Sequence, residues 1–125
     1  FSGQGINIIG HIDKIVVNAE LHPDFKKLHT YFYSEIERLL IKHKSKGYIL
    51  EINTRSIYKK LRSAAYPNYQ VIGFASKNDI PLILNSDAHH FSELNLAFDK
   101  VQAELKSMKI SPKWFEWSQL EEFLK

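Results

Sequence analysis

Hydrophobic positions divide this chain into short apolar runs that alternate with longer segments of helical periodicity. The short runs, each bounded by glycine, proline or asparagine, are residues 6–9, 48–52 and 82–84. Runs of this length between turn-forming residues are typical of buried strands. Strands separated by helices predict an α/β fold with a parallel sheet, because parallel neighbours need long crossover connections.

The segment 24–44 has the clearest helical pattern. Its apolar positions recur every three or four residues and form one predicted stripe: Phe25, Leu28, Phe32, Ile36, Leu39, Leu40 and His43. Pro23 suits the first turn of this helix. Gly47 is suited to end it, because glycine readily adopts the left-handed conformation that follows many helices.

Two further helices are predicted in the C-terminal half of the chain. Residues 69–78 carry Ile72 and Ala75 on their inward face, and Ser92 is placed to cap a helix that runs to residue 109. Residues 55–67, between the second strand and the first of these helices, are basic and loop-like. The short elements expected elsewhere are an apolar stretch at 15–17, a helical turn at 57–61, a strand at 114–117 and a capped helix from 118 to 125.

Length and composition fit one modest domain. The chain has 125 residues, of which 44% are hydrophobic and 25% charged. It has no cysteine, which excludes disulfides and thiolate metal ligands. No apolar run approaches the ~20 residues of a membrane-spanning helix, and nothing at the start is typical of a signal peptide. We therefore expect a cytoplasmic protein with no membrane partner.

The net charge is +3, from 17 basic and 14 acidic residues. Much of the excess lies in two groups: Lys42, Lys44 and Lys46, and Lys59, Lys60 and Arg62. This surplus could steer an anionic substrate toward the protein. It is too small and too scattered for a nucleic-acid-binding face, so we expect no nucleic-acid partner.

Polar residues that can bind ligands follow each predicted strand. They are His11 and Asp13 after the first strand, Asn53, Thr54 and Arg55 after the second, and Asn85, Ser86, Asp87, His89 and His90 after the third. Active sites of parallel α/β folds gather at the carboxyl ends of the strands. The recurrence therefore indicates a functional site at this edge of the sheet.

Asp87 and His89 form the most specific pair. In an extended segment, residues two apart point to the same side, so both side chains would enter one pocket. A carboxylate and an imidazole on one face suit Zn, Fe or Mn. The alternative is that Asp87 caps the following helix and that the histidines are ordinary loop residues.

Gly10-His11-Ile12-Asp13 is a second candidate motif. His11 would be a third metal ligand, since Gly10 allows a close approach of the backbone. Asp13 could orient an imidazole from behind. The alternative is a hydrogen-bonded histidine at a strand end, followed by a turn-forming aspartate.

The remaining charged residues near the strand ends carry weaker signals. Glu51 points away from its neighbours in the second strand and is either turned into a barrel lumen or paired with a lysine. One of the basic residues Arg55, Lys59, Lys60 and Arg62 could clamp a substrate phosphate. Structural or surface roles are expected for His22, His29 and His43.

Three motifs together resemble a known family. Gly10-His11-Ile12-Asp13, then residues 50–54 (Leu-Glu-Ile-Asn-Thr), then residues 85–89 (Asn-Ser-Asp-Ala-His) look like the later motifs of the PHP (polymerase and histidinol phosphatase) family. The resemblance is greatest to its histidinol-phosphatase branch and covers nearly the whole chain. It implies a distorted (β/α)7 TIM-like barrel with up to three divalent metal ions and a bridging hydroxide that attacks a phosphate monoester.

The resemblance also implies roles for particular residues. His11, Asp87 and His89 match metal ligands of the family. A basic residue a few positions after the Leu-Glu-Ile-Asn-Thr motif contacts the substrate phosphate in histidinol phosphatases, and here we assign that role to Arg55. The cofactors implied are Zn, Mn or Fe ions, and the partner implied is a small-molecule phosphate ester.

The sequence departs from the family at its start. The opening His-x-His motif of the family is absent, the first residue is Phe1 and the only methionine is Met108. We therefore expect residues 1–125 to be the C-terminal portion of one PHP domain, inactive alone. A partial barrel would leave open sheet edges through which the chain could self-associate.

The leading functional hypothesis is hydrolysis of histidinol phosphate in histidine biosynthesis. Another PHP phosphoesterase, of the protein-tyrosine phosphatase or nuclease type, is an alternative. A third hypothesis is a non-catalytic binding module that keeps the fold and uses the cleft for a partner.

Overall fold

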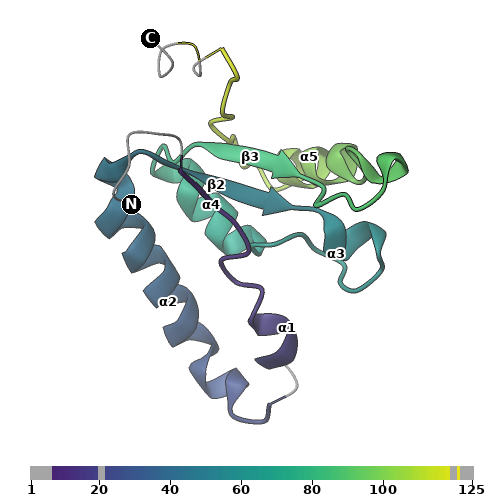
Figure 1. The fold of residues 1–125 in the computed structure, drawn as a ribbon. Coiled ribbons are helices and arrows are strands. Elements are labelled where there is room, and N and C mark those ends of the chain that lie inside the picture. The colour runs from purple at the N-terminus through teal and green to yellow at the C-terminus, as the bar shows by residue number, and fades with distance from the viewer. Residues whose placement is uncertain (1–6, 20–21, 119–120, 122–125) are drawn as a thin grey trace.

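The computed structural model describes residues 7–19, 22–118 and 121, and shows a small parallel sheet with helices packed against it (Figure 1). The strands are β1 (Asn7–Ile9), β2 (Tyr48–Asn53) and β3 (Leu82–Asn85), in the order β1-β2-β3. Both pairings are parallel, with Leu50 of β2 opposite Ile9 on one side and Leu82 on the other. The predicted α/β class and parallel sheet are therefore confirmed.

Helices lie between successive strands in the chain, as parallel strands require. The helices are α1 (Val16–Ala19), α2 (Phe25–His43), α3 (Arg55–Tyr58), α4 (Tyr69–Lys77) and α5 (Phe98–Ser107), with short 3-10 turns η1 (Lys44–Lys46) and η2 (Phe91–Glu93). Gly47 has φ of 68° and ends the 3-10 turn after α2, as its position predicted. Asn68 caps α4 by accepting a hydrogen bond from the Val71 amide.

The central strand β2 is buried along its whole length. Because successive side chains of a strand point to opposite faces, Leu50 and Ile52 enter the main core while Glu51 and Asn53 point the other way. The main core also contains fully buried residues of the helices, among them Leu40, Ile72, Ala75 and Val101. The inward positions predicted for Ile72 and Ala75 are confirmed.

The stripe predicted for α2 is partly wrong. Ile36 and Leu40 are buried, but Leu28 is 56% exposed and Leu39 is also exposed. Tyr33, which the pattern did not select, is buried instead and packs against the rings of His29 and Phe32. The buried line therefore follows Tyr33, Ile36 and Leu40, which share one helical face at spacings of three and four residues.

The helix predicted from Ser92 to residue 109 is also wrong at its start. Helix α5 begins at Phe98, and Ser92 lies in the turn η2, which has no side-chain cap. Ala97 precedes α5 with φ of 64°, and Asn95 also has positive φ, so the backbone cannot run as one helix through this region. This segment instead contacts residues that follow β2, since Glu93 pairs with Arg55 and the Leu96 carbonyl accepts a hydrogen bond from the Thr54 hydroxyl at 2.7 Å.

The short elements differ from their predictions in detail. The apolar stretch at 15–17 falls in and beside α1, and the turn predicted at 57–61 is the helix α3 at Arg55–Tyr58. The strand predicted at 114–117 is reduced to an isolated parallel bridge between Trp114 and Leu82. The helix predicted from 118 to 125 lies mostly outside the described residues.

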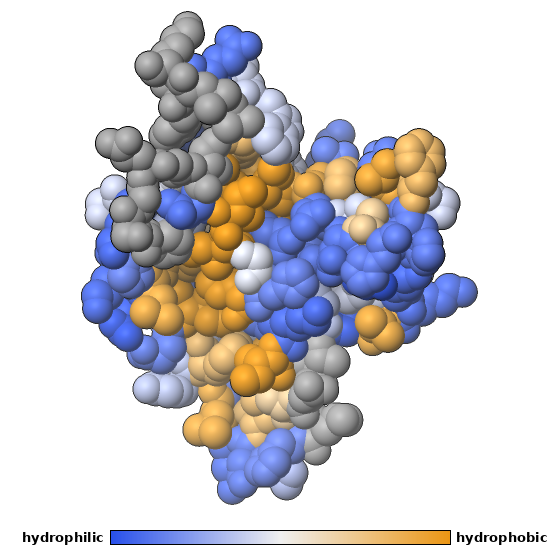
Figure 2. Space-filling view, viewed as in Figure 1, coloured by the Kyte–Doolittle hydropathy of each residue, from blue (hydrophilic) through white to orange (hydrophobic). Residues whose placement is uncertain are grey.

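Hydrophobic side chains form a band down the middle of one face of the molecule, with hydrophilic side chains beside it (Figure 2). The large apolar residues that remain exposed include Ile8, Ile15, Leu28 and Tyr31. Within the described part of the chain, no helix has the length and hydropathy needed to cross a bilayer.

Candidate metal centre

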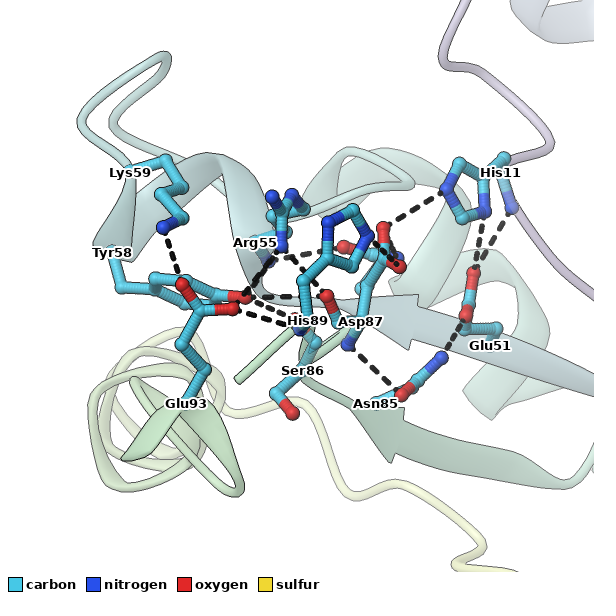
Figure 3. Close-up of polar contacts among 11 residues, drawn as sticks. His11, Glu51, Arg55, Tyr58, Lys59, Asn85, Ser86, Asp87, His89 and Glu93 are labelled. Carbon is cyan, nitrogen blue, oxygen red and sulfur yellow. Dashed lines mark hydrogen bonds and ion pairs between the residues drawn. The ribbon is translucent and has the colours of Figure 1, made fainter. Parts of the chain in front are cut away.

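The carboxyl ends of the three strands bring their polar residues to one edge of the sheet (Figure 3). We call this edge the rim. His11 follows β1, Glu51 lies near the end of β2, and Asp87 and His89 follow β3. The sequence predicted that His11, Asp87 and His89 would lie together, and the structure brings these three side chains together.

Asp87 lies between the two imidazoles. Its Oδ2 is 3.5 Å from Nε2 of His11, and its Oδ1 is 3.5 Å from Nε2 of His89. Two ligand atoms bound about 2.1 Å from one tetrahedral zinc ion would be about 3.4 Å apart. Each Asp87–His separation therefore has the spacing of two ligands around a metal ion, and is longer than a normal hydrogen bond.

Glu51 holds His11 from behind. Its Oε2 is 3.1 Å from Nδ1 of His11 and also accepts the His11 backbone amide at 3.1 Å. Its Oε1 accepts a hydrogen bond from the Asn85 side-chain amide. When Nδ1 donates its proton to Glu51, the lone pair of Nε2 is left facing Asp87. Among the residues that the structure describes, Glu51 is therefore paired with a histidine and not with a lysine.

Gly10 makes room for this contact. A Cβ atom at position 10 would lie 2.9 Å from Oε2 of Glu51 and 3.3 Å from its Cδ. Real Cβ atoms essentially never come so close, so any larger residue would push the Glu51 carboxylate away from His11. The predicted need for a close approach at Gly10 is confirmed.

Asp13 has a different role from the one predicted. It is fully buried and accepts hydrogen bonds from the Tyr33 hydroxyl at 3.3 Å and the Asn68 amide at 2.8 Å. Among the described residues it makes no ion pair with an imidazole, and Glu51 occupies the position behind His11. Burial raises the pKa of Asp13 above its usual value. Asp13 therefore ties the segment after β1 to α2 and to the start of α4.

Two of the three predicted ligands have an unusual backbone conformation. His11 has φ of 55° and Asp87 has φ of 52°, in the left-handed region where a residue other than glycine costs roughly 1–2 kcal/mol. Such strain persists when surrounding contacts determine the conformation, and it clusters at functional sites. Asp87 is therefore not in the extended segment that its i, i+2 spacing with His89 assumed. The alternative, that it caps the next helix, is not observed either, since η2 has no side-chain cap.

A second group of charges lies beside His89. Nη1 of Arg55 donates to the Asp87 carbonyl at 2.8 Å and lies 3.4 Å from Oε2 of Glu93. Lys59 forms an ion pair with the other oxygen of Glu93. The Lys59 hydrogen bond, followed by that of the His89 amide, lowers the pKa of Glu93 to about 2. Arg55 therefore lies at the rim, as predicted, but one of its nitrogens is committed to the protein.

Sequence reasoning did not select Glu93, although its carboxylate is buried among these groups. The helical pattern placed it in the first turn of a helix capped by Ser92. Its spacing of four residues from His89 was the available signal, and it is too common to carry weight alone. Tyr58, whose hydroxyl donates to the Ser86 carbonyl at 2.7 Å, was also missed, because its partner lies 28 positions away in the chain.

The histidines that were assigned structural or surface roles lie elsewhere. His22 is exposed, and its Nδ1 accepts the Asp24 amide at 3.2 Å. His29 packs edge-on against Phe25 and tilted against Tyr33, both of which are also residues of α2. Both belong to the region around α2 and not to the rim.

The rim is not a complete metal cage by itself. Over residues 7–19, 22–118 and 121, no group of three or more histidine, cysteine, aspartate or glutamate side chains is close enough together to hold a metal ion. The predicted ligands meet in pairs through Asp87, and the His89 side chain is 61% exposed. The pairs therefore fit an ion at the rim only together with ligands from other groups, such as water, substrate or further protein residues.

Comparisons with models of known protein families, with curated proteins and with solved structures find no match for this chain.

Proposed function

We propose that this chain contributes part of the active site of a metal-dependent phosphate-monoester hydrolase, with histidinol phosphate as the substrate. The observation that carries the proposal is the position of Asp87, 3.5 Å from Nε2 of both His11 and His89. The contact of Glu51 with the opposite nitrogen of His11 supports it, because metal-binding histidines usually donate their other N–H to a carboxylate or carbonyl.

His11, Asp87 and His89 would hold a divalent ion such as Zn, Mn or Fe. When bound, such an ion lowers the pKa of a coordinated water and neutralises charge on a phosphoryl group. Glu51 keeps the His11 proton on Nδ1 and so leaves Nε2 available. The strained backbone at His11 and Asp87 supports a functional role, because contacts from elsewhere in the fold maintain it.

Arg55 would bind the phosphate of the substrate. All of its side-chain hydrogen bonds to described residues use Nη1, which contacts the Tyr58 hydroxyl, the Asp87 carbonyl and Glu93. Nε and Nη2 make no hydrogen bond to the described residues, and together they have the fork geometry that suits two phosphate oxygens. The anchored Nη1 would fix the direction of this fork beside the metal ligands.

We propose further that the sheet is part of a (β/α)7 barrel and that the remaining metal ligands come from outside the described residues. The parallel order β1-β2-β3, with helices between the strands, supports the barrel. The chain by itself would then bind a metal ion weakly and would not turn over substrate. A cytoplasmic location would fit the histidine-biosynthetic role.

The test is a phosphatase assay on the polypeptide that the complete gene encodes, with added Mn²⁺ and with histidinol phosphate, phosphotyrosine or single-stranded DNA as substrate. Histidinol phosphate should be hydrolysed best, and both chelation and Asp87→Ala should abolish turnover. Asp99→Ala is the matched control, because Asp99 is an exposed residue of α5. Turnover that survives both chelation and Asp87→Ala would contradict the proposal, and no turnover of any substrate would favour the binding module.

A further inference from the structure

Glu93 lies in the turn η2 with its side chain only 7% exposed, although it is a carboxylate outside the predicted metal ligands. Burying an ionised carboxylate is costly unless charged partners and hydrogen bonds compensate. Here Arg55 and Lys59 supply the opposite charge, and the His89 amide supplies a hydrogen bond. Glu93 thus joins α3 to the segment that carries the predicted ligands (Figure 3).

Its carboxylate holds both ends of the segment Asp87-Ala88-His89. Oε2 accepts the backbone amide of His89 at 2.9 Å and lies 3.4 Å from Nη1 of Arg55. The same Nη1 donates to the Asp87 carbonyl at 2.8 Å. One carboxylate therefore fixes the amide at the end of the segment directly and the carbonyl at its start through Arg55.

These contacts also maintain the strained conformation of Asp87. Its amide donates to the Asn85 side chain at 3.0 Å, and its carbonyl accepts from Arg55, so both sides of the left-handed residue are held. Without Glu93, Nη1 of Arg55 would keep the Tyr58 hydroxyl and the Asp87 carbonyl but would lose its carboxylate partner. The His89 amide would lose its acceptor. The backbone between Asp87 and His89 could then relax, and their side chains would move apart.

We infer that Glu93 is a positioning residue, which sets the separation of the Asp87 carboxylate and the His89 imidazole and so determines the affinity of the rim for a metal ion. This inference rests on the proposed metal-binding function. Glu93 acts through the backbone of the ligand segment and through Arg55, and its hydrogen bonds and ion pairs to described residues do not include the side chains of Asp87 and His89. Residues that orient ligands in this way typically change metal affinity by 10–100-fold when they are replaced, which is about the effect expected here.

The experiment measures the Zn²⁺ affinity of the full 125-residue chain by competition with a chromophoric chelator. Glu93→Ala should bind Zn²⁺ roughly tenfold more weakly than the unmodified chain. Glu93→Gln should lose less, because its amide oxygen can still accept the His89 amide. Glu35→Gln is the matched control and should leave the affinity unchanged, since Glu35 pairs with Arg38 on the surface of α2.

A double variant separates positioning from simple charge balance. Lys59→Met with Glu93→Ala restores the net charge of the cluster but still leaves the His89 amide and Arg55 without Glu93. Its Zn²⁺ affinity should stay as low as that of Glu93→Ala. Recovery of the affinity in the double variant would overturn the inference, because Glu93 would then act only by neutralising Lys59.

The outcomes distinguish this inference from the proposed function. If Asp87→Ala loses Zn²⁺ binding while Glu93→Ala and Glu93→Gln bind as the unmodified chain does, the inference fails and the proposed metal site stands. If the unmodified chain binds no Zn²⁺, or if Asp87→Ala has no effect, the proposed site fails and the inference fails with it. Circular dichroism checks each fold, and Glu93→Gln decides the result if Glu93→Ala does not fold.

Discussion

The two sides of the rim hold their histidines in different ways. On one side, Glu51 lies in the buried central strand and contacts the His11 imidazole directly. On the other side, Glu93 lies in a short 3-10 turn, pairs with Arg55 and Lys59, and accepts a hydrogen bond from the backbone amide of His89. The His11 side chain is 36% exposed, compared with 61% for His89. The sheet thus fixes one ring, whereas a network of charges fixes the segment that carries the other.

The difference shows that a strand and a loop position the residues of a site by different kinds of contact. A strand in the middle of a sheet has little freedom, so a side chain at its end can hold a ligand in one orientation and one tautomer. A loop has many conformations, and it needs several polar contacts to select one of them. We therefore expect substitutions on the Glu51 side to act on metal binding most strongly, and substitutions on the Glu93 side to act also on the stability of the loop.

Replacing Glu51 with glutamine should produce the largest effect. Glutamine keeps the shape of the side chain, but it is a weaker acceptor for the His11 imidazole and no longer favours the tautomer with Nε2 unprotonated. The Zn²⁺ affinity of the full chain should fall about 10–100-fold, as measured by chelator competition. Glu37→Gln is the control, because Glu37 accepts a hydrogen bond from the Gln70 side chain on the surface. This variant should bind Zn²⁺ with the affinity of the unmodified chain. Equal affinities for all three proteins would show that Glu51 does not support His11.

Gly10→Ala should act on the same contact without changing a polar group. The added Cβ would lie 2.9 Å from Oε2 of Glu51 and would displace the carboxylate from His11, with a loss of Zn²⁺ affinity of about tenfold. Gly47→Ala is the informative comparison, because a Cβ there meets no atom within 4 Å but φ is 68°. It should cost about 1 kcal/mol of stability in urea unfolding and leave the metal affinity unchanged. If Gly10→Ala binds Zn²⁺ normally, the close approach has no function.

The strain at His11 can be measured separately from its chemistry. Because φ at His11 is 55°, His11→Gly should be more stable than His11→Ala by about 1 kcal/mol in urea unfolding, although both variants lose the imidazole. The same pair of substitutions at His22, which is not among the residues with positive φ, should show no such advantage for glycine. Equal stability of the two His11 variants would mean that the left-handed conformation carries no strain.

The smallest effect expected is a change in acid stability on the Glu93 side. The folded protein holds the pKa of Glu93 at about 2, below the ordinary value of 4.5. The folded state therefore favours the carboxylate, and the stability that it contributes is fully present above pH 4.5 and is lost as the pH falls toward 2. The unfolding midpoint of Glu93→Gln should fall less steeply in this range than that of the unmodified chain. Parallel curves for the two proteins would contradict the low pKa.

Periodicity in the sequence predicted the regular parts of the fold. The three strands, α2 and α4 were found because short apolar runs and helical spacing determine such elements locally. The helix predicted from Ser92 failed because Asn95 and Ala97 have left-handed backbone conformations. The burial of Glu93 was missed because it depends on Arg55 and Lys59, which are distant in the sequence. Tyr33 was missed because its burial depends on which side of α2 meets the sheet.

The site was predictable to a similar extent. The rule that parallel strands present ligands at their carboxyl ends selected His11, Asp87 and His89, which the structure brings to one rim. Their supporting residues were not predictable, because Glu51 lies forty positions from His11 in the chain and no local pattern links the two. The extended geometry assumed for Asp87 and His89 was wrong for the same reason, since side chains elsewhere hold Asp87 in its conformation.

The most direct test of the central claim is a Zn²⁺ titration followed by long-range ¹H–¹⁵N NMR of the histidine side chains. If His11, Asp87 and His89 bind one centre, the Nε2 signals of His11 and His89 should shift together, and Asp87→Ala should remove both shifts. The signals of His22, His29 and His43 should stay in place. Shifts of similar size at all histidines, or none at His11 and His89, would contradict the account.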